Sequence, residues 1–180
     1  TRELVTLQYN TYNRSLVPLM HQHGIVVMDA FEDLSESQAA FVDRYFEDNV
    51  YPVLTPMAVD ASRPFPLIRN KTLNIAALLS KKKGKAEKEE IEFATVQVPS
   101  VLPRLVHIPS EDGNEKTFIL LEQVIERNID KLFLNYDVLC AYPYRVMRNA
   151  DLSIDEDEAA DLLKEIQKQL KMRQWGEVNR

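Results

Sequence analysis

Five basic residues have the chemistry to bind phosphate, and they fall in two short stretches of the chain. A guanidinium group can hold two phosphate oxygens at once, and an ammonium group attracts them as a point charge. The five are Arg63, Arg69 and Lys71 in the first stretch, and Arg145 and Arg148 in the second. We take them as the candidate residues for a phosphate contact.

A simpler explanation of the same residues needs no ligand. Salt bridges to carboxylates, or plain solubility, account for surface arginines in most proteins, and the carboxylates to consider are Asp60, Asp137 and Asp151. Arg145 and Arg148 are also three residues apart. On a strand this spacing would place them on opposite faces, so only one of them could join a common lining. Both interpretations stay open.

The other reactive side chains give no catalytic set. The four glycines are too scattered to form a phosphate-binding loop. His21 and His23 lie two residues apart at the end of a predicted helix, and His107 lies in a predicted short strand, with no evident partner for catalysis. We therefore predict no catalytic residue and no metal ligand in this chain.

Some polar and aromatic residues could serve either the fold or a ligand contact. Tyr142 and Tyr144 alternate onto one face of a predicted strand, which suits a core or a subunit interface better than a ligand contact. Asn70 and Asn74 could form a polar rim. The lysines of residues 81–85 are followed by glutamates within residues 87–90, so this run favours a solvated loop over a grip on a polyanion.

Composition limits the class of protein. The chain has 180 residues, of which 45% are hydrophobic and 28% charged, as expected for a globular protein. Its net charge of -6 argues against a nucleic-acid platform but leaves room for a local basic lining. The single cysteine excludes an internal disulfide and suits a reducing cytosol, and no apolar run approaches the roughly 20 residues that span a bilayer. Because residue 1 is not methionine, we expect a piece of a larger protein.

Hydrophobic periodicity predicts an α+β fold. A helix over residues 1–21 ends before Gly24, and Ser35 with Gln38 forms a capping box that opens a second helix. Two further helices are expected at residues 121–133 and 153–173. Strands are predicted at residues 72–80, 92–98, 105–108, 117–121 and 139–147. These elements indicate two layers, in which a mixed or mainly antiparallel sheet carries helices on one side.

Prolines stiffen the segment from Tyr51 to Pro66, YPVLTPMAVDASRPFP. Each proline fixes its own φ and disfavours helical geometry in the residue before it. The segment contains four of the nine prolines of the chain. We therefore predict a rigid, extended ribbon, with the preceding helix ending at Tyr51.

Several blocks of the sequence resemble the polyphosphate kinase family. The ribbon resembles the segment "(F/Y)PVLTPLAVDPxxPFP" that opens the family's head domain, and similar blocks follow in family order. They are NKTLNIAALL at residues 70–79, ATVQVPSVLPRL at 94–105, TFILLEQVIERNIDKLF at 117–133, DVLCAYPYRVMRNADL at 137–152 and GEVNR at 176–180. The chain departs from the pattern at Arg63, where relatives have His or Asp, and at Asn149, where Asp is usual.

The resemblance implies three parts. Residues 1–24 would be the last helix of the N-terminal domain, residues 25–175 the head domain, and residues 176–180 the start of the first catalytic domain. The parent enzyme would reversibly transfer the γ-phosphate of ATP to polyphosphate through a phosphohistidine, with Mg²⁺. The catalytic histidine and the metal ligands would lie after Arg180, so this chain alone is expected to bind no cofactor and to be inactive.

The family also implies a role for the head domain. It would form a homodimer or a higher oligomer and help to bound the tunnel through which polyphosphate passes, beside the catalytic domains of the same polypeptide. No nucleic acid is expected as a partner, and the location would be the cytoplasm or the periphery of the inner membrane. The alternative is a purely structural dimerisation module that makes no phosphate contact.

Overall fold

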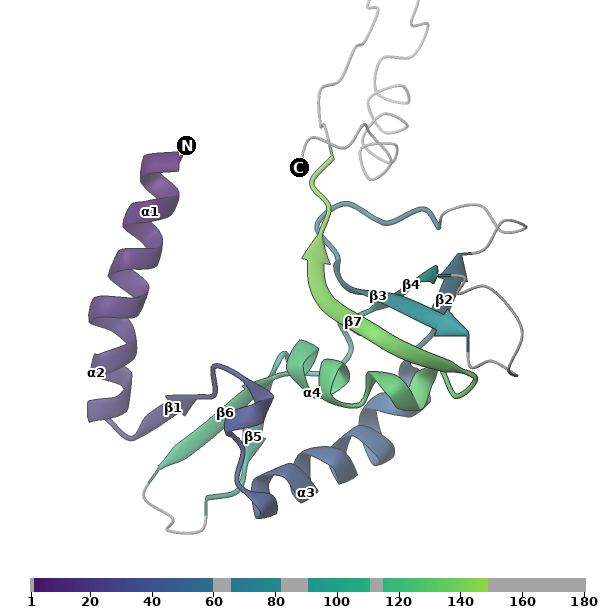
Figure 1. Cartoon of the computed structure of the whole chain (residues 1–180). Helices are drawn as coiled ribbons and strands as arrows, with labels where there is room; N and C mark the ends of the chain where they lie inside the picture. Colours follow the sequence, from purple (N-terminus) through teal and green to yellow (C-terminus); the bar gives the residue numbers. More distant parts are fainter. Residues whose placement is uncertain (1, 60–65, 82–90, 111–114, 149–180) are drawn as a thin grey trace, which may run out of the picture. The chain divides into compact units, whose positions relative to one another are not determined.

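The computed structural model describes residues 2–59, 66–81, 91–110 and 115–148 (Figure 1). Contacts between residues divide the chain into two compact units. Unit 1 consists of Thr1–Val53 and Pro99–Asn128, and unit 2 of Leu54–Val98 and Ile129–Arg180. Each unit is therefore built from two separate stretches of sequence and contains its own sheet.

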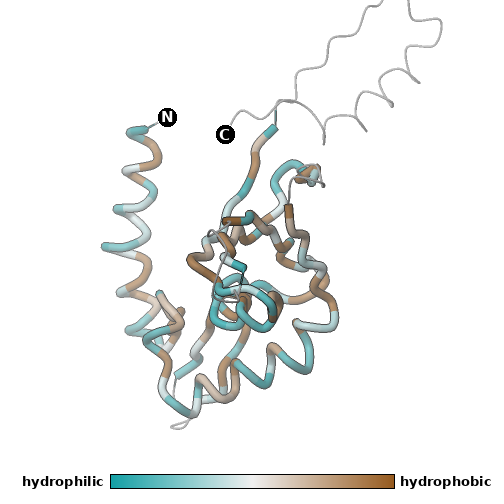
Figure 2. Tube along the Cα trace, turned by 45° about the vertical axis from the view of Figure 1, so that its right-hand side comes forward, coloured by the Kyte–Doolittle hydropathy of each residue, from teal (hydrophilic) through white to brown (hydrophobic). Residues whose placement is uncertain are grey.

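Unit 1 begins with a long helix. It consists of α1 (Arg2–Thr11), the π-helical turn η1 (Tyr12–Leu16) and α2 (Val17–Gln22). The helix ends as predicted, because Gly24 takes a φ of 68° that glycine adopts without steric cost. None of its described residues is buried, and Figure 2 shows apolar and polar residues alternating along it.

The remainder of unit 1 packs a three-stranded sheet with two helices. The sheet order is β1-β6-β5, in which β1 runs parallel to β6 and β5 antiparallel to it. The elements are β1 (Ile25–Val27), η2 (Phe31–Asp33), α3 (Glu36–Tyr45), η3 (Phe46–Val50), η4 (Tyr51–Val53), β5 (Leu105–Ile108), β6 (Lys116–Leu120) and α4 (Leu121–Arg127).

Helix α3 supplies the core of unit 1. The predicted capping box is present, since the Ser35 hydroxyl accepts the Gln38 N–H and the Gln38 side chain accepts the Ser35 N–H. Val42, Phe46 and Val50 recur every fourth residue along α3 and η3, and all three are 0% exposed. Helix α4 is joined to α3 by a bidentate pair, in which Arg127 donates to the two Asp43 carboxylate oxygens at 2.8 and 3.0 Å.

Unit 2 is organised around a four-stranded antiparallel sheet of order β2-β4-β3-β7. Its elements are β2 (Pro56–Val59), β3 (Leu73–Lys81), β4 (Ile91–Gln97), η5 (Ile129–Leu132) and β7 (Tyr136–Arg145). Ile75, Ala77 and Leu79 alternate onto the buried face of β3. The long ladder between β3 and β7 runs from Leu73 opposite Arg145 to Lys81 opposite Tyr136, with a register shift after Leu78.

The predicted α+β class is confirmed, with one mixed and one antiparallel sheet where a single sheet had been expected. The extended ribbon begins later than predicted. Tyr51–Val53 is a 3-10 turn, and Tyr51 itself is helical, with φ -51° and ψ -44°. The helical backbone of η3 continues through Tyr51, whose ring packs edge-on against Phe46, and this overrides the local effect of Pro52.

Some predictions fall on residues outside the described ranges. These are the helix at residues 153–173, the charged loop beyond Lys81 and the start of the first catalytic domain at residues 176–180. The three-part division at residues 24 and 175 stays a prediction.

Unit 1 contains a carboxylate with a strongly perturbed proton affinity. Burial, reinforced by the neighbouring Glu122 and Glu32, raises the pKa of Glu126 to about 7. An ordinary Glu in the unfolded chain titrates near pH 4.3. The folded state therefore holds more protons between these values, and stability falls as the pH rises from about 4.5 through 7.

We predict that Glu126→Gln stabilises the chain at pH 8 and has little effect at pH 4. The gain should be on the order of 1 kcal/mol, because solvent at a half-buried site screens much of the repulsion. Urea denaturation at the two pH values measures it. The exposed Glu115 offers a control, since Glu115→Gln should leave the pH dependence unchanged. Equal pH dependence in Glu126→Gln and the parent chain would contradict the prediction.

Candidate functional site

The candidate site lies in unit 2, where the turn before β3 meets the end of β7. Beyond the last ladder pair, Leu73 with Arg145, the Lys71 N–H donates to the Val146 carbonyl at 2.8 Å. The turn is closed by Thr72, whose hydroxyl donates to the Arg69 carbonyl at 2.9 Å. Two stretches of the chain therefore run side by side although they lie far apart in the sequence. Asn70 and Arg148, which are in contact, are 78 residues apart.

Arg148 fastens this turn by two hydrogen bonds. Its backbone N–H donates to the Asn70 side-chain oxygen at 3.0 Å, and its Nε donates to the Ile68 carbonyl at 2.9 Å. Ile68 is only 4% exposed, so the guanidinium group reaches back to the buried side of the turn. Two hydrogen-bond donors of Arg148, its backbone N–H and its Nε, therefore stabilise the fold.

Lys71 occupies an unusual backbone conformation. Its φ is 62°, and it is the one described residue other than glycine with a positive φ. The left-handed region costs a residue with a side chain roughly 1–2 kcal/mol, whereas glycine enters it freely and Asn tolerates it. The hydrogen bond from Lys71 to Val146 holds the residue there.

The structure brings four of the five predicted cations together at this corner. We call Arg69, Lys71, Arg145 and Arg148 the basic corner. Arg69, Lys71 and Arg145 are exposed and Arg148 is half-buried. The fifth, Arg63, lies outside the described residues. The two stretches that form the corner, residues 66–74 and 141–148, contain no Asp or Glu.

One carboxylate of the salt-bridge explanation, that of Asp137, lies too far from Arg145 to pair with it. Asp137 pairs with Ser80 at the far end of β7, while Arg145 ends that strand. At about 3.3 Å per residue, roughly 25 Å separates them. Asp60 and Asp151 lie outside the described ranges. Among the described residues, Arg69, Lys71 and Arg145 form no ion pair.

The condition for placing Arg145 and Arg148 on opposite faces, a strand that runs through both residues, is not met. Strand β7 ends at Arg145, so the alternation of faces does not extend to Arg148. The chain instead follows the Arg69–Thr72 turn through the bonds of Val146 and Arg148. The sequence carried no signal for this course, because it depends on contacts between distant residues.

A polar pair supports the sheet beside the basic corner. Tyr144 and Thr95 share a hydrogen bond of 2.8 Å between their hydroxyl groups. Thr95 is 0% exposed, and burial raises the pKa of Tyr144. Asn74, 1% exposed, donates to the carbonyl and hydroxyl oxygens of Thr72 at 3.0 and 3.1 Å. Asn74 is therefore part of the scaffold of the turn, and the structure does not place it on an open rim.

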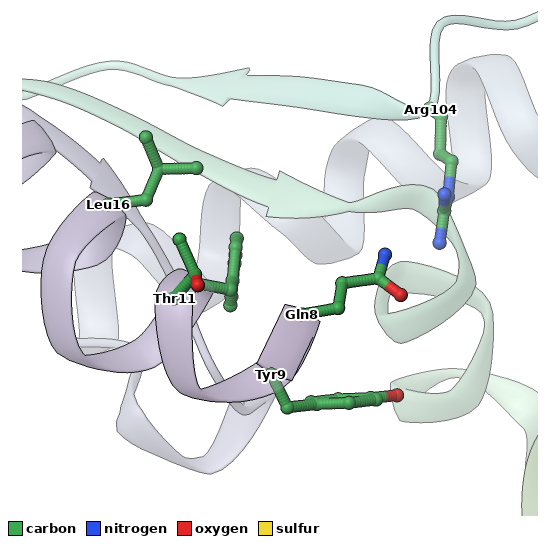
Figure 3. A pocket seen from close by; sticks show the side chains of 6 residues that line it. Gln8, Tyr9, Thr11, Leu16 and Arg104 are labelled. Atoms are coloured by element: carbon green, nitrogen blue, oxygen red, sulfur yellow. The ribbon is translucent and has the colours of Figure 1, made fainter. Parts of the chain in front are cut away.

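Unit 1 contains a separate pocket of about 760 Å³ beside the N-terminal helix. Figure 3 shows the Gln8 side chain extending toward Arg104. The lining residues are Gln8, Tyr9, Thr11, Tyr12, Leu16 and Arg104. Arg104 donates from Nε to both carboxylate oxygens of the buried Glu122, at 3.0 and 3.2 Å. This pairing neutralises Arg104, the one charged residue among the described residues of the lining, so the pocket suits phosphate less well than the basic corner.

The described residues offer neither a metal-binding cluster nor a membrane-spanning helix. No cluster of three or more His, Cys, Asp or Glu side chains among them could hold a metal ion. None of their helices is long and apolar enough to cross a membrane.

Comparison with known proteins places the fold. The chain is similar to the crystal structure of polyphosphate kinase from Porphyromonas gingivalis, with a TM-score of 0.72 and 24% sequence identity over 94% of this chain and 27% of that one. At this identity the likeness concerns the fold alone.

Sequence relatives give the class and the family. Polyphosphate kinase from Lactiplantibacillus plantarum is 52% identical over 99% of this chain, and that from Halalkalibacterium halodurans is 48% identical over 97%. The chain covers 24% of the length of each relative. These relatives belong to the class of kinases, and the chain aligns with about a quarter of their length. Residues 37–180 match the polyphosphate kinase middle domain. The chain belongs to this family, which confirms the resemblance predicted from its sequence.

We predict that Tyr144→Phe destabilises the chain by about 1–3 kcal/mol, because it leaves the buried Thr95 hydroxyl without this partner. Adding Thr95→Val should recover much of the loss, since the double variant removes both polar groups. Urea denaturation of the two single variants and the double variant measures the coupling. Tyr142→Phe, at an exposed position of the same strand, is the matched control. Simple addition of the two single costs would refute the pairing.

Proposed function

We propose that this chain is the head domain of a polyphosphate kinase that reversibly transfers the γ-phosphate of ATP to polyphosphate, through a phosphohistidine and with Mg²⁺. Membership of the middle-domain family supports this proposal, as does the 24% share of the relatives that the chain covers. The catalytic histidine, the metal ligands and the ATP contacts belong to other domains of the same polypeptide. The chain alone is then inactive, and the enzyme works in the cytoplasm or at the periphery of the inner membrane.

The basic corner is the observation that supports a contact with the polymer. The chain as a whole carries a charge of -6, yet this corner gathers four cations and no carboxylate from its two stretches. A phosphate chain repeats the same negative charge along its length, so it needs positive charge without a particular sequence of partners. Arg69, Lys71 and Arg145 are exposed and can meet it.

Exposed apolar and aromatic side chains of the four-stranded sheet support the dimer. Tyr142 is 68% exposed, and Leu78 and Leu139 beside the register shift are 39% and 53% exposed. Large apolar and aromatic side chains of this kind are enriched in subunit interfaces. We propose that these three residues, the sheet patch, contact a second copy of the chain.

A purely structural dimerisation module is the second candidate. It would use the same sheet patch, and it differs only in making no contact with phosphate. Polyphosphate binding separates the two candidates directly.

We predict that the chain binds polyphosphate with an affinity that falls steeply as salt rises, because released counterions dominate such binding. Arg145→Ala should weaken binding about three- to tenfold and lower the salt slope by roughly one. Fluorescence titration at several salt concentrations measures both quantities. Arg44→Ala removes an exposed arginine of unit 1 and should change neither. Absence of binding at every salt concentration would favour the structural module.

We also predict that Tyr142→Asp raises the dissociation constant of the dimer at least tenfold. The substitution places a charge among apolar side chains that bury each other in the interface. Sedimentation equilibrium gives the constant. Val101→Asp, at a position 77% exposed in unit 1, should leave it unchanged. An equal monomer fraction in Tyr142→Asp and the parent chain would exclude the sheet patch as the interface.

A further inference from the structure

The cations of the basic corner differ in how the fold uses them. Arg148 is half-buried and bonded to the Ile68 carbonyl through Nε, and its backbone is bonded to Asn70. Lys71 is exposed, and its backbone N–H donates to the Val146 carbonyl. One residue therefore holds the turn, while the other carries an ammonium group on it.

The identity of residue 71 is unfavourable for the fold. A left-handed position in a turn suits glycine or asparagine, and a long side chain there gains nothing from the backbone. Strain of this kind persists where the surroundings fix it, and it concentrates at ligand contacts. The three bonds of Lys71 and Arg148 to the opposite stretch are the surroundings that fix it here.

We propose that Lys71 is a phosphate contact of the basic corner that its strained turn presents to the ligand, and that Asn70 and Arg148 are positioning residues that lock this turn against the end of β7. The inference rests on the proposed function. It gives different roles to Lys71 and Arg148, which the sequence analysis could not distinguish. The ligand it takes is a linear polyphosphate. Its repeating oxygens suit a compact ammonium charge on a fixed backbone, because no particular phosphate has to be recognised.

Substitutions at residue 71 separate charge from backbone strain. Lys71→Asn keeps a residue that tolerates the left-handed region and removes the ammonium group. We expect its melting temperature to equal or exceed that of the parent chain, while its polyphosphate affinity falls about three- to tenfold and its salt slope drops by roughly one. Lys71→Arg keeps the charge and should keep both binding quantities.

Substitutions at the positioning residues act through the turn. Arg148→Lys preserves the charge and loses the Nε bond to Ile68, and Asn70→Ala loses the bond to the Arg148 backbone. In both variants we expect the Lys71 amide to exchange its hydrogen at least tenfold faster, because its bond to Val146 opens more often. The affinity for polyphosphate should fall in Arg148→Lys and in Asn70→Ala. In Lys71→Asn, by contrast, the amide of residue 71 should stay as well protected from exchange as in the parent chain.

Fluorescence titration with polyphosphate of defined length and amide hydrogen exchange, both on the full 180-residue chain, test the assignment together. A parent chain that binds polyphosphate while Lys71→Asn keeps its affinity and salt slope would overturn the inference and leave the proposed function standing. Unchanged Lys71 exchange in Arg148→Lys and Asn70→Ala would overturn the positioning roles. A parent chain that binds no polyphosphate would overturn the phosphate contact and the proposed tunnel role at once.

Discussion

One backbone hydrogen bond, from Lys71 to the Val146 carbonyl at 2.8 Å, carries the ladder of β3 and β7 past its last residue pair. It holds two stretches of like charge side by side, although exposed cations repel each other. The repulsion between such groups is weak in water and weaker in salt. A few hydrogen bonds at the end of the sheet are enough to outweigh this repulsion, and Arg148 supplies two of them.

The sheet beneath this corner gives it a firm base. Ile75, Ala77 and Leu79 are at most 1% exposed, and the pair of Thr95 and Tyr144 leaves no polar group of its own unsatisfied. Sites built on packed strands hold their geometry better than sites on free loops. The backbone that carries the cations is therefore held in place without a ligand, which lowers the conformational entropy that binding must overcome.

Local signals predicted most of the elements. The helix that ends at Gly24, the capping box of Ser35 and Gln38, and the paired strands β3 with β4 and β5 with β6 all depend on residues close in sequence. The division into two sheets was not predicted, because β1 pairs with β6 and β3 with β7 across long separations.

The candidate site likewise combines features that depend on local sequence with features that depend on contacts between distant residues. Residue type and the grouping of the residues in two short stretches identified the four cations that the structure brings together at the basic corner, since Lys and Arg carry positive charge at neutral pH without shifted titration. Their different roles could not be predicted, because they arise from contacts with Ile68, Asn70 and Val146. The left-handed conformation of Lys71 also had no local cue, as no glycine marks the turn. The resemblance to a family suggested the reaction proposed for the parent enzyme, which no pattern in this chain's own side chains had indicated.

Chemical-shift mapping of the isotopically labelled chain, titrated with polyphosphate, tests most directly whether the basic corner meets the polymer. The account predicts that the largest amide shifts fall on residues 69–72 and 145–148, and that they vanish in high salt. Shifts confined to the pocket beside the N-terminal helix, or no shifts in either stretch at any salt concentration, would contradict it.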